Sequence, residues 1–256
     1  MNQYWESFLQ WLHSVGLHPD REAVERAGSA MLDGAGNVAA SVGQAASGMD
    51  MAGLMALAAA LGWTSGFRLY IVVFLVGLLG AVGWVPLPGG LHVLEHPAML
   101  FASGGLLFVE FFADKIPGVD SLWDLLQSVL RVPAGAALAA GVFGADNATM
   151  AMVAAVMGGS LAATSQAAKT TTRALINTSP EPFSNVGASL AEDTVAVGAV
   201  WLALANPAVF AVVLVIAVIA MWVVTWMLWR FLKAALRKLQ GWMGSGDAHA
   251  LQPPKT

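Results

Sequence analysis

The feature that most constrains this fold is a succession of apolar segments that fills the chain from Met51 onward. A helix that crosses a bilayer needs about 20 consecutive apolar residues, and several of these segments are that long. Only 11% of the 256 residues are charged, whereas soluble domains average about 25%. A soluble protein of this size would lack the polar surface needed to cover its core. We therefore predict an all-α fold, a polytopic transmembrane helical bundle.

The same composition excludes several functional classes. The net charge is −4 and there is no basic tract, so we expect no nucleic-acid partner. The chain has no cysteine, which excludes a disulfide scaffold, a thiolate metal site and a cysteine nucleophile. We expect the lipid bilayer as the main partner, no cofactor and no enzymatic activity.

The chain divides into three parts. Residues 1–50 comprise an amphipathic N-terminal helix and a Gly/Ala-rich linker, 51–240 form the transmembrane domain, and 241–256 form a flexible cytoplasmic tail. Large apolar residues at helical spacing in 1–16 predict a helix that lies on the membrane, or that docks a second copy or a membrane-complex partner. No Lys or Arg precedes Arg21, so we expect no secretory signal.

Six or seven spans are predicted. The apolar segments are 51–63, 67–85, 97–116, 132–145, 148–176, 186–205 and 208–230. The first is short, and we expect a re-entrant or half-span helix that is broken at Thr64-Ser65-Gly66. Polar or helix-breaking pairs at Asp146-Asn147 and Asn206-Pro207 predict turns between long segments.

The basic residues predict the orientation of the bundle. When the spans are alternated, all basic residues after the linker fall on one side of the membrane. They are Arg68, Lys115, Arg131, Lys169, Arg173, Arg230, Lys233, Arg237, Lys238 and Lys255. Cytoplasmic loops carry the Lys/Arg excess, so we predict a cytoplasmic C-terminus. Trp222, Trp226 and Trp229 would form the interfacial belt of the last span.

Ionisable residues within or beside the spans are the candidate functional residues. A charge at the centre of a membrane helix costs about 2.5–3.5 kcal/mol on insertion scales, so such residues by default face a cavity or a partner. The candidates for substrate or ion binding are Arg68, Glu110, Asp114, Lys115, Asp120, Asp124, Lys169, Arg173, Asn177, Glu181, Glu192 and Asp193. We predict that they converge on a polar cavity that faces the cytoplasm.

Spacing and charge balance shape this prediction. Glu110 and Asp114 are four residues apart, which places both carboxylates on one helix face. Gln166, Lys169, Thr170, Arg173 and Asn177 form a polar stripe at helical spacing. Counting four cations (Arg68, Lys115, Lys169 and Arg173) against seven acids leaves a surplus of three negative charges, which favours a cavity that takes up protons or cations.

Two segments look like copies of one another. Each of 97–145 and 148–205 contains a span that ends in cations, a turn with proline, and a capped helix that bears acids. Both would run in the same direction across the membrane. We therefore consider a parallel internal repeat.

Three motifs resemble a known family. They are the run Glu110-Phe-Phe-Ala-Asp-Lys-Ile-Pro-Gly-Val-Asp-Ser-Leu-Trp-Asp124, the run Ser65-Gly-Phe-Arg-Leu-Tyr70, and the run from Asn177-Thr-Ser-Pro-Glu-Pro through Leu190-Ala-Glu-Asp193. Together they resemble the bacterial membrane proteins catalogued as domain of unknown function 4126, over about residues 50–240. The resemblance implies a multi-helix protein of the bacterial inner membrane, and it implies no activity.

A metal site has one weak motif. His92-Val-Leu-Glu95-His96 matches the H-x-x-E-H pattern of inverted zincins, in which two histidines one turn apart share a metal. Gly89-Gly90 before it and Pro97 after it leave at most two helical turns. An interfacial helix is the preferred interpretation, with His92, Glu95 and His96 as weak metal candidates.

Three functional hypotheses remain from the sequence. The first is a transporter or channel-like permease for a small solute, an ion or a lipid headgroup. The second is a structural or assembly subunit whose charges only hold helices together. The third is an intramembrane lipid-phosphate enzyme, in which Asp120 and Asp124 hold a divalent metal while Lys169 and Arg173 bind the phosphate.

Overall fold

A computed structural model describes residues 25–26, 28–30, 33–34, 49–113, 116, 119–176 and 182–249. The regular elements are α3 (Met51–Ala81), η1 (Gly89–Glu95), α4 (Pro97–Ala113), α5 (Val119–Gly141), α6 (Ala148–Ile176), α7 (Pro182–Ala205) and α8 (Pro207–His249). No strand occurs in these ranges, which confirms the all-α prediction. The predicted N-terminal helix at 1–16 lies outside the described residues.

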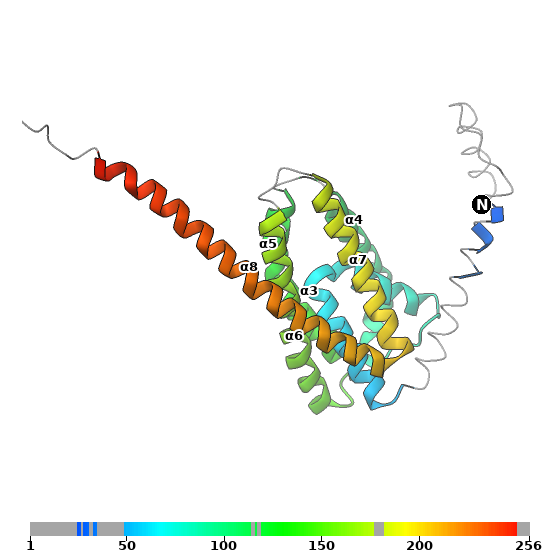
Figure 1. Ribbon diagram of the computed structural model, residues 1–256. Helices are drawn as coiled ribbons and strands as arrows, with labels where there is room; N and C mark the ends of the chain where they lie inside the picture. Colours follow the sequence, from blue (N-terminus) through cyan, green and yellow to red (C-terminus); the bar gives the residue numbers. More distant parts are fainter. Residues whose placement is uncertain are drawn as a thin grey trace, which may run out of the picture.

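Helix α3 lies at the centre of the bundle (Figure 1) and contacts every other element from η1 to α8. Helices α5 and α6 pack along each other, whereas α4 with α5, and α6 with α7, share few contacts. Both predicted hairpins are therefore splayed around α3. The predicted repeat between them stays a prediction.

Glycines allow the close approach of α3 to α6. Added at Gly62, a Cβ would lie 2.4 Å from the Cα of Gly158; at Gly66 it would collide with the Ser165 hydroxyl. That hydroxyl donates a hydrogen bond of 2.7 Å to the carbonyl of Trp63. Small residues that let backbones approach are typical of helix packing inside membranes.

The predicted break at Thr64-Ser65-Gly66 is wrong. One helix runs through these residues, and the non-helical residue is Arg68, with φ −143° and ψ 74°. The side chains of Thr64 and Ser65 instead donate to carbonyls of their own helix, at 2.6 Å to Ala60 and 2.7 Å to Gly62. Hydroxyls that bond to carbonyls one turn back are found within helices, and they often bend them.

Among the described residues, four helices are long and apolar enough to cross a membrane. They are Met51–Ala81, Ala148–Ile176, Val186–Ala205 and Pro207–Phe231. A fifth crossing results if η1 and α4, which are bent by 68° relative to each other, count as one span. The described residues thus hold fewer candidate spans than the six or seven predicted. The predicted segments 51–63 and 67–85 fuse into α3 up to Ala81, and residues 132–141 of the segment 132–145 belong to the longer helix α5.

The predicted turns are confirmed at both places. Residues 142–147 form the turn before α6, and Asn206 separates α7 from α8. Asn147 and Asn206 each accept a backbone hydrogen bond of 3.2 Å from three residues ahead, the geometry of a helix N-cap.

Helix α8 extends far beyond the bundle (Figure 1). It has 43 residues, and it includes 241–249, which the sequence analysis assigned to the tail. Near the end of its apolar part, Arg230 lies 4.7 Å from the ring centre of Trp226, and Lys233 lies 5.1 Å from that of Trp229. These pairs place tryptophan and basic residues together where an interfacial anchor was predicted.

Candidate functional site

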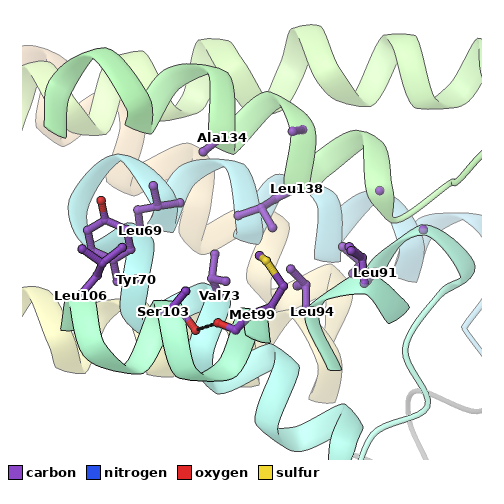
Figure 2. A pocket seen from close by; sticks show the side chains of 15 residues that line it. Leu69, Tyr70, Val73, Leu91, Leu94, Met99, Ser103, Leu106, Ala134 and Leu138 are labelled. Carbon is purple, nitrogen blue, oxygen red and sulfur yellow. Dashed lines mark hydrogen bonds between the residues drawn. The ribbon is translucent and has the colours of Figure 1, made fainter. Parts of the chain in front are cut away.

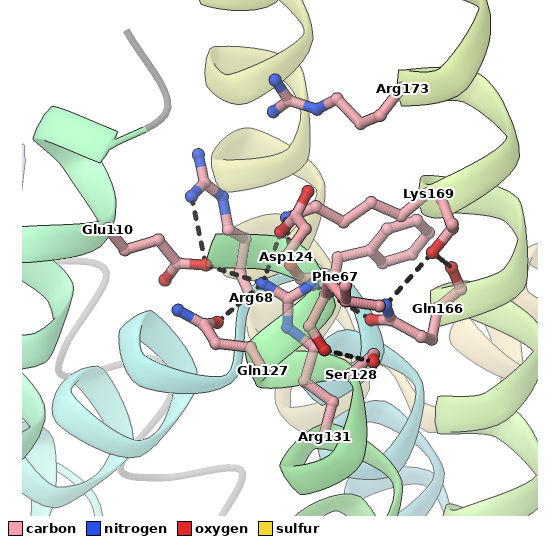
Figure 3. A network of polar contacts seen from close by, with 12 residues as sticks. Phe67, Arg68, Glu110, Asp124, Gln127, Ser128, Arg131, Gln166, Lys169 and Arg173 are labelled. Atoms are coloured by element: carbon pink, nitrogen blue, oxygen red, sulfur yellow. Dashed lines mark hydrogen bonds and ion pairs between the residues drawn. The ribbon is translucent and has the colours of Figure 1, made fainter. Parts of the chain in front are cut away.

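Charged side chains from five helices, buried on α3 to α6 and half-buried on α7, meet beside the break in α3. Figure 3 shows those of α3 to α6. We call the whole set the charged network. In the described part of the chain it consists of Arg68 (α3), Glu110 (α4), Asp124 and Arg131 (α5), Lys169 and Arg173 (α6), and Glu192 and Asp193 (α7). Arg68, Glu110, Arg131 and Lys169 are each at most 2% exposed. These charges are inside the bundle and face one another.

Arg131 is the centre of one half of the network. Its Nη2 lies 2.9 Å from Glu110 Oε1 and 2.9 Å from Asp124 Oδ1. It also donates to the side-chain carbonyls of Gln127, at 2.7 Å, and Gln166, at 3.0 Å. A guanidinium carries five N–H donors in a fixed plane, which suits several acceptors at once. Arg131 thereby ties α5 to α4 and α6.

Arg68 joins α4 to α7. Its Nη1 lies 3.4 Å from Glu110 Oε1, and its Nε lies 2.8 Å from Asp193 Oδ1 and 3.5 Å from Glu192 Oε2. Its Nη2 also donates to the hydroxyl and the carbonyl of Ser189. Arg68 is itself the non-helical residue of α3, so its side chain leaves the backbone at the break.

Lys169 is enclosed by oxygens of three helices. Its Nζ lies 3.0 Å from the carbonyl oxygen of Phe67, 3.1 Å from Asp124 Oδ1 and 3.1 Å from Glu192 Oε2. One turn further along α6, Arg173 Nη2 lies 3.4 Å from the same oxygen of Glu192. Glu192 therefore pairs with two cations of the polar stripe through one carboxylate oxygen.

Seven predicted candidates are brought together. They are Arg68, Glu110, Asp124, Lys169, Arg173, Glu192 and Asp193. Asp114, Lys115, Asn177 and Glu181 lie outside the described residues, and so does the side chain of Asp120. The central prediction, that Glu110, Lys169 and Glu192 belong to one cluster, is consistent with this geometry.

Arg131 is the residue that sequence reasoning missed. It was counted only among the basic residues of the predicted cytoplasmic side, yet its side chain is fully buried between α4, α5 and α6. The usable signal was its spacing from Asp124 and Gln127, seven and four residues away, which places all three on one face of a helix.

Including Arg131 changes the charge balance. The described network contains four cations and four carboxylates, so its formal charge is zero. The predicted surplus also counted Asp114, Lys115, Asp120 and Glu181, whose side chains lie outside the described residues, so it stays a prediction. Removing each ion from water costs several kcal/mol, and only close partners and further hydrogen bonds compensate for that.

Some polar atoms of the network keep unused bonding capacity. Asp124 Oδ2, Gln127 Nε2 and Arg131 Nε are buried and have no hydrogen-bond partner among the described residues. All three belong to one face of α5. They can accept from, or donate to, a further polar group.

One pocket touches the network, and another does not. The first, of about 350 Å³, is bordered by Phe67, Lys169 and Glu192 and otherwise mainly by apolar residues of α6, α7 and α8. The second is also about 350 Å³ and lies between α3, η1, α4 and α5 (Figure 2). Its lining is apolar apart from Tyr70 and Ser103, whose hydroxyl already donates to the carbonyl of Met99 at 2.6 Å.

The weak metal motif lies on the short helix η1. His92 Nδ1 contacts Glu95 Oε1 at 2.9 Å, and the His92 side chain is 59% exposed. His96 Nδ1 accepts a hydrogen bond of 3.2 Å from the backbone of Ala98. Over the ranges that the structure covers, no group of three His, Asp or Glu side chains is arranged to hold a metal ion.

Comparison with known proteins identifies one family. The family model described as "Domain of unknown function (DUF4126)" matches residues 55–229. This range contains the whole charged network. No curated protein and no solved structure matches the chain.

Proposed function

We propose that this chain, which belongs to the family described as a domain of unknown function (DUF4126), is a transporter or channel-like permease and not an enzyme. The described residues hold four to five helices that are long and apolar enough to cross a membrane, which supports a membrane protein. The charged network is the part through which a small solute or ion would pass. The family description assigns no activity, so the proposal is based on the network alone.

The observation that carries the proposal is the position of the network at an interrupted span. Arg68 breaks α3, and the carbonyl of the preceding residue, Phe67, accepts a hydrogen bond from Lys169. In secondary transporters, substrate and coupling-ion sites lie where membrane helices are discontinuous, and unwound carbonyls coordinate the ion. Ion pairs shared between five helices also give those helices a means of moving together.

The experiment is a flux assay with reconstituted protein. We expect wild-type protein in liposomes to move at least one member of a panel of protons, alkali cations, inorganic anions and small zwitterions. Glu192→Gln should slow this flux severalfold, because Glu192 pairs with Arg68, Lys169 and Arg173. Glu95→Gln is the matched control, since Glu95 pairs with exposed His92 outside the network. No flux across the panel, or equal flux in both variants, contradicts the proposal.

A structural subunit is the second candidate, and the balanced charge of the network favours it. A purely structural cluster needs no net charge, and four cations with four carboxylates meet that condition. This alternative predicts that Glu192→Gln lowers thermal stability while the wild-type protein carries no flux. Measuring stability and flux on the same samples separates the two candidates.

We also propose a bacterial inner-membrane location with a cytoplasmic C-terminus, as the distribution of basic residues suggests. A reporter that is active only in the cytoplasm, fused after residue 256, is expected to be active. A second reporter inserted in the turn at 144–147 should be inactive, because that turn contains no Lys or Arg and lies at the opposite end of α6 from Arg173. The reverse pattern would overturn the orientation.

A further inference from the structure

We infer that the ammonium group of Lys169 occupies a binding site for a monovalent cation, and that a free cation takes this place when the lysine withdraws. The inference rests on the proposed transport function and names its substrate class. The site consists of the Phe67 carbonyl and the carboxylates of Asp124 and Glu192.

The donor set suits a hard cation. Three oxygens from α3, α5 and α7 surround Lys169 Nζ at 3.0, 3.1 and 3.1 Å. An ammonium has three donors and no acceptor, so this cage satisfies it completely. Carbonyl and carboxylate oxygens are also what alkali and alkaline-earth ions bind. A bare cation could therefore use the same oxygens.

The cage has more oxygen than the lysine uses. Asp124 is 6% exposed, and its Oδ2 is buried without a hydrogen-bond partner among the described residues. An ammonium with three bonds has no donor left for this atom, whereas a metal ion can bind both oxygens of a carboxylate. The unpartnered oxygen thus gives Asp124 spare capacity to bind a cation beyond the contacts that it makes now.

The charge balance selects a monovalent ion. With the Lys169 ammonium in place, the described network has four positive and four negative groups. When that ammonium leaves, one negative charge stays unbalanced, and one monovalent cation restores neutrality. A divalent ion would leave an excess positive charge inside the bundle, where unbalanced charge is costly.

Space for the exchange lies beside the cage. The pocket of about 350 Å³ between α6, α7 and α8 is bordered by Lys169, Glu192 and Phe67. Lysine has a flexible four-carbon stem, so its ammonium can move away from the cage on this side without a change of the backbone. An incoming cation can reach Glu192 from the same side.

The test is thermal unfolding of full-length Lys169→Ala in detergent, at constant ionic strength, in sodium, potassium, lithium, magnesium or choline chloride. Anything that binds the folded state raises the midpoint with concentration. We expect sodium or potassium to raise the midpoint of this variant well above its value in choline, and above that in magnesium. Wild-type protein should respond less, because its lysine already occupies the cage.

The double variant Lys169→Ala/Glu192→Gln is the matched control. It leaves three cations and three carboxylates in the described network and removes one carboxylate of the cage. Its unfolding midpoint should therefore be the same in sodium as in choline. The inference is overturned if Lys169→Ala has the same unfolding midpoint in all salts. It is also overturned if no salt yields folded Lys169→Ala protein. If the cation response is present but wild-type liposomes carry no flux, the site stands and the transport proposal fails.

Discussion

Replacing Arg131 with methionine is expected to lower the free energy of unfolding by about 3–5 kcal/mol, the range for removing one partner of a buried ion pair. Arg131 is fully buried and lies 2.9 Å from carboxylate oxygens of both Glu110 and Asp124. Without it, Glu110 keeps Arg68 and Asp124 keeps Lys169, each with fewer compensating bonds. Two carboxylates and two glutamine carbonyls lose a donor in a single substitution.

Chemical or thermal unfolding in detergent measures this loss. Arg230→Met is the matched control, because Arg230 lies on α8 beside Trp226, outside the bundle core, and its loss should cost less than about 1 kcal/mol. Arg131→Lys keeps the charge but loses the planar fork, so we expect an intermediate value. Equal stability of Arg131→Met and Arg230→Met would mean that Arg131 does not organise the network.

Gly62→Ala is expected to cost about 3 kcal/mol, the upper end of the range for overpacking a tight core. The added Cβ would lie 2.4 Å from the Cα of Gly158, and its next nearest atoms are the carbonyl oxygen and carbon of the same residue. Since all three are backbone atoms, no side chain can rotate away. Helices α3 and α6 would have to separate. Because Phe67 lies on α3 and Lys169 on α6, the contact between these two residues would lengthen as well.

Gly105→Ala in α4 is the comparison, because a Cβ there meets nothing within 4 Å. Alanine is the better helix former by up to about 1 kcal/mol, so this variant should be no less stable than wild type. Unfolding midpoints of the two variants give the contrast. If Gly62→Ala unfolded at the same midpoint as wild type, the contact between α3 and α6 would be looser than the distances at Gly62 indicate.

Local chemistry made part of the fold predictable. Inside a bilayer every backbone group must bond within its own segment, so long apolar runs with few charges indicate helices. The segment 148–176 was predicted with the bounds that α6 has, and the turns at Asn147 and Asn206 follow from polar residues between apolar runs. The break in α3 was misplaced, because the hydroxyls of Thr64 and Ser65 found acceptors one turn back within the helix.

By itself, the sequence determined that the chain forms apolar helices and that its charges need partners, because both follow from the exclusion of water from a bilayer. Only the tertiary structure decided which charges pair. Glu110 and Arg131 lie on α4 and α5, and Lys169 and Glu192 on α6 and α7, so their distances depend on how those helices are placed around α3. The depth of Arg131 has the same origin. Helical spacing defines a face, but what covers that face comes from residues far away in the chain.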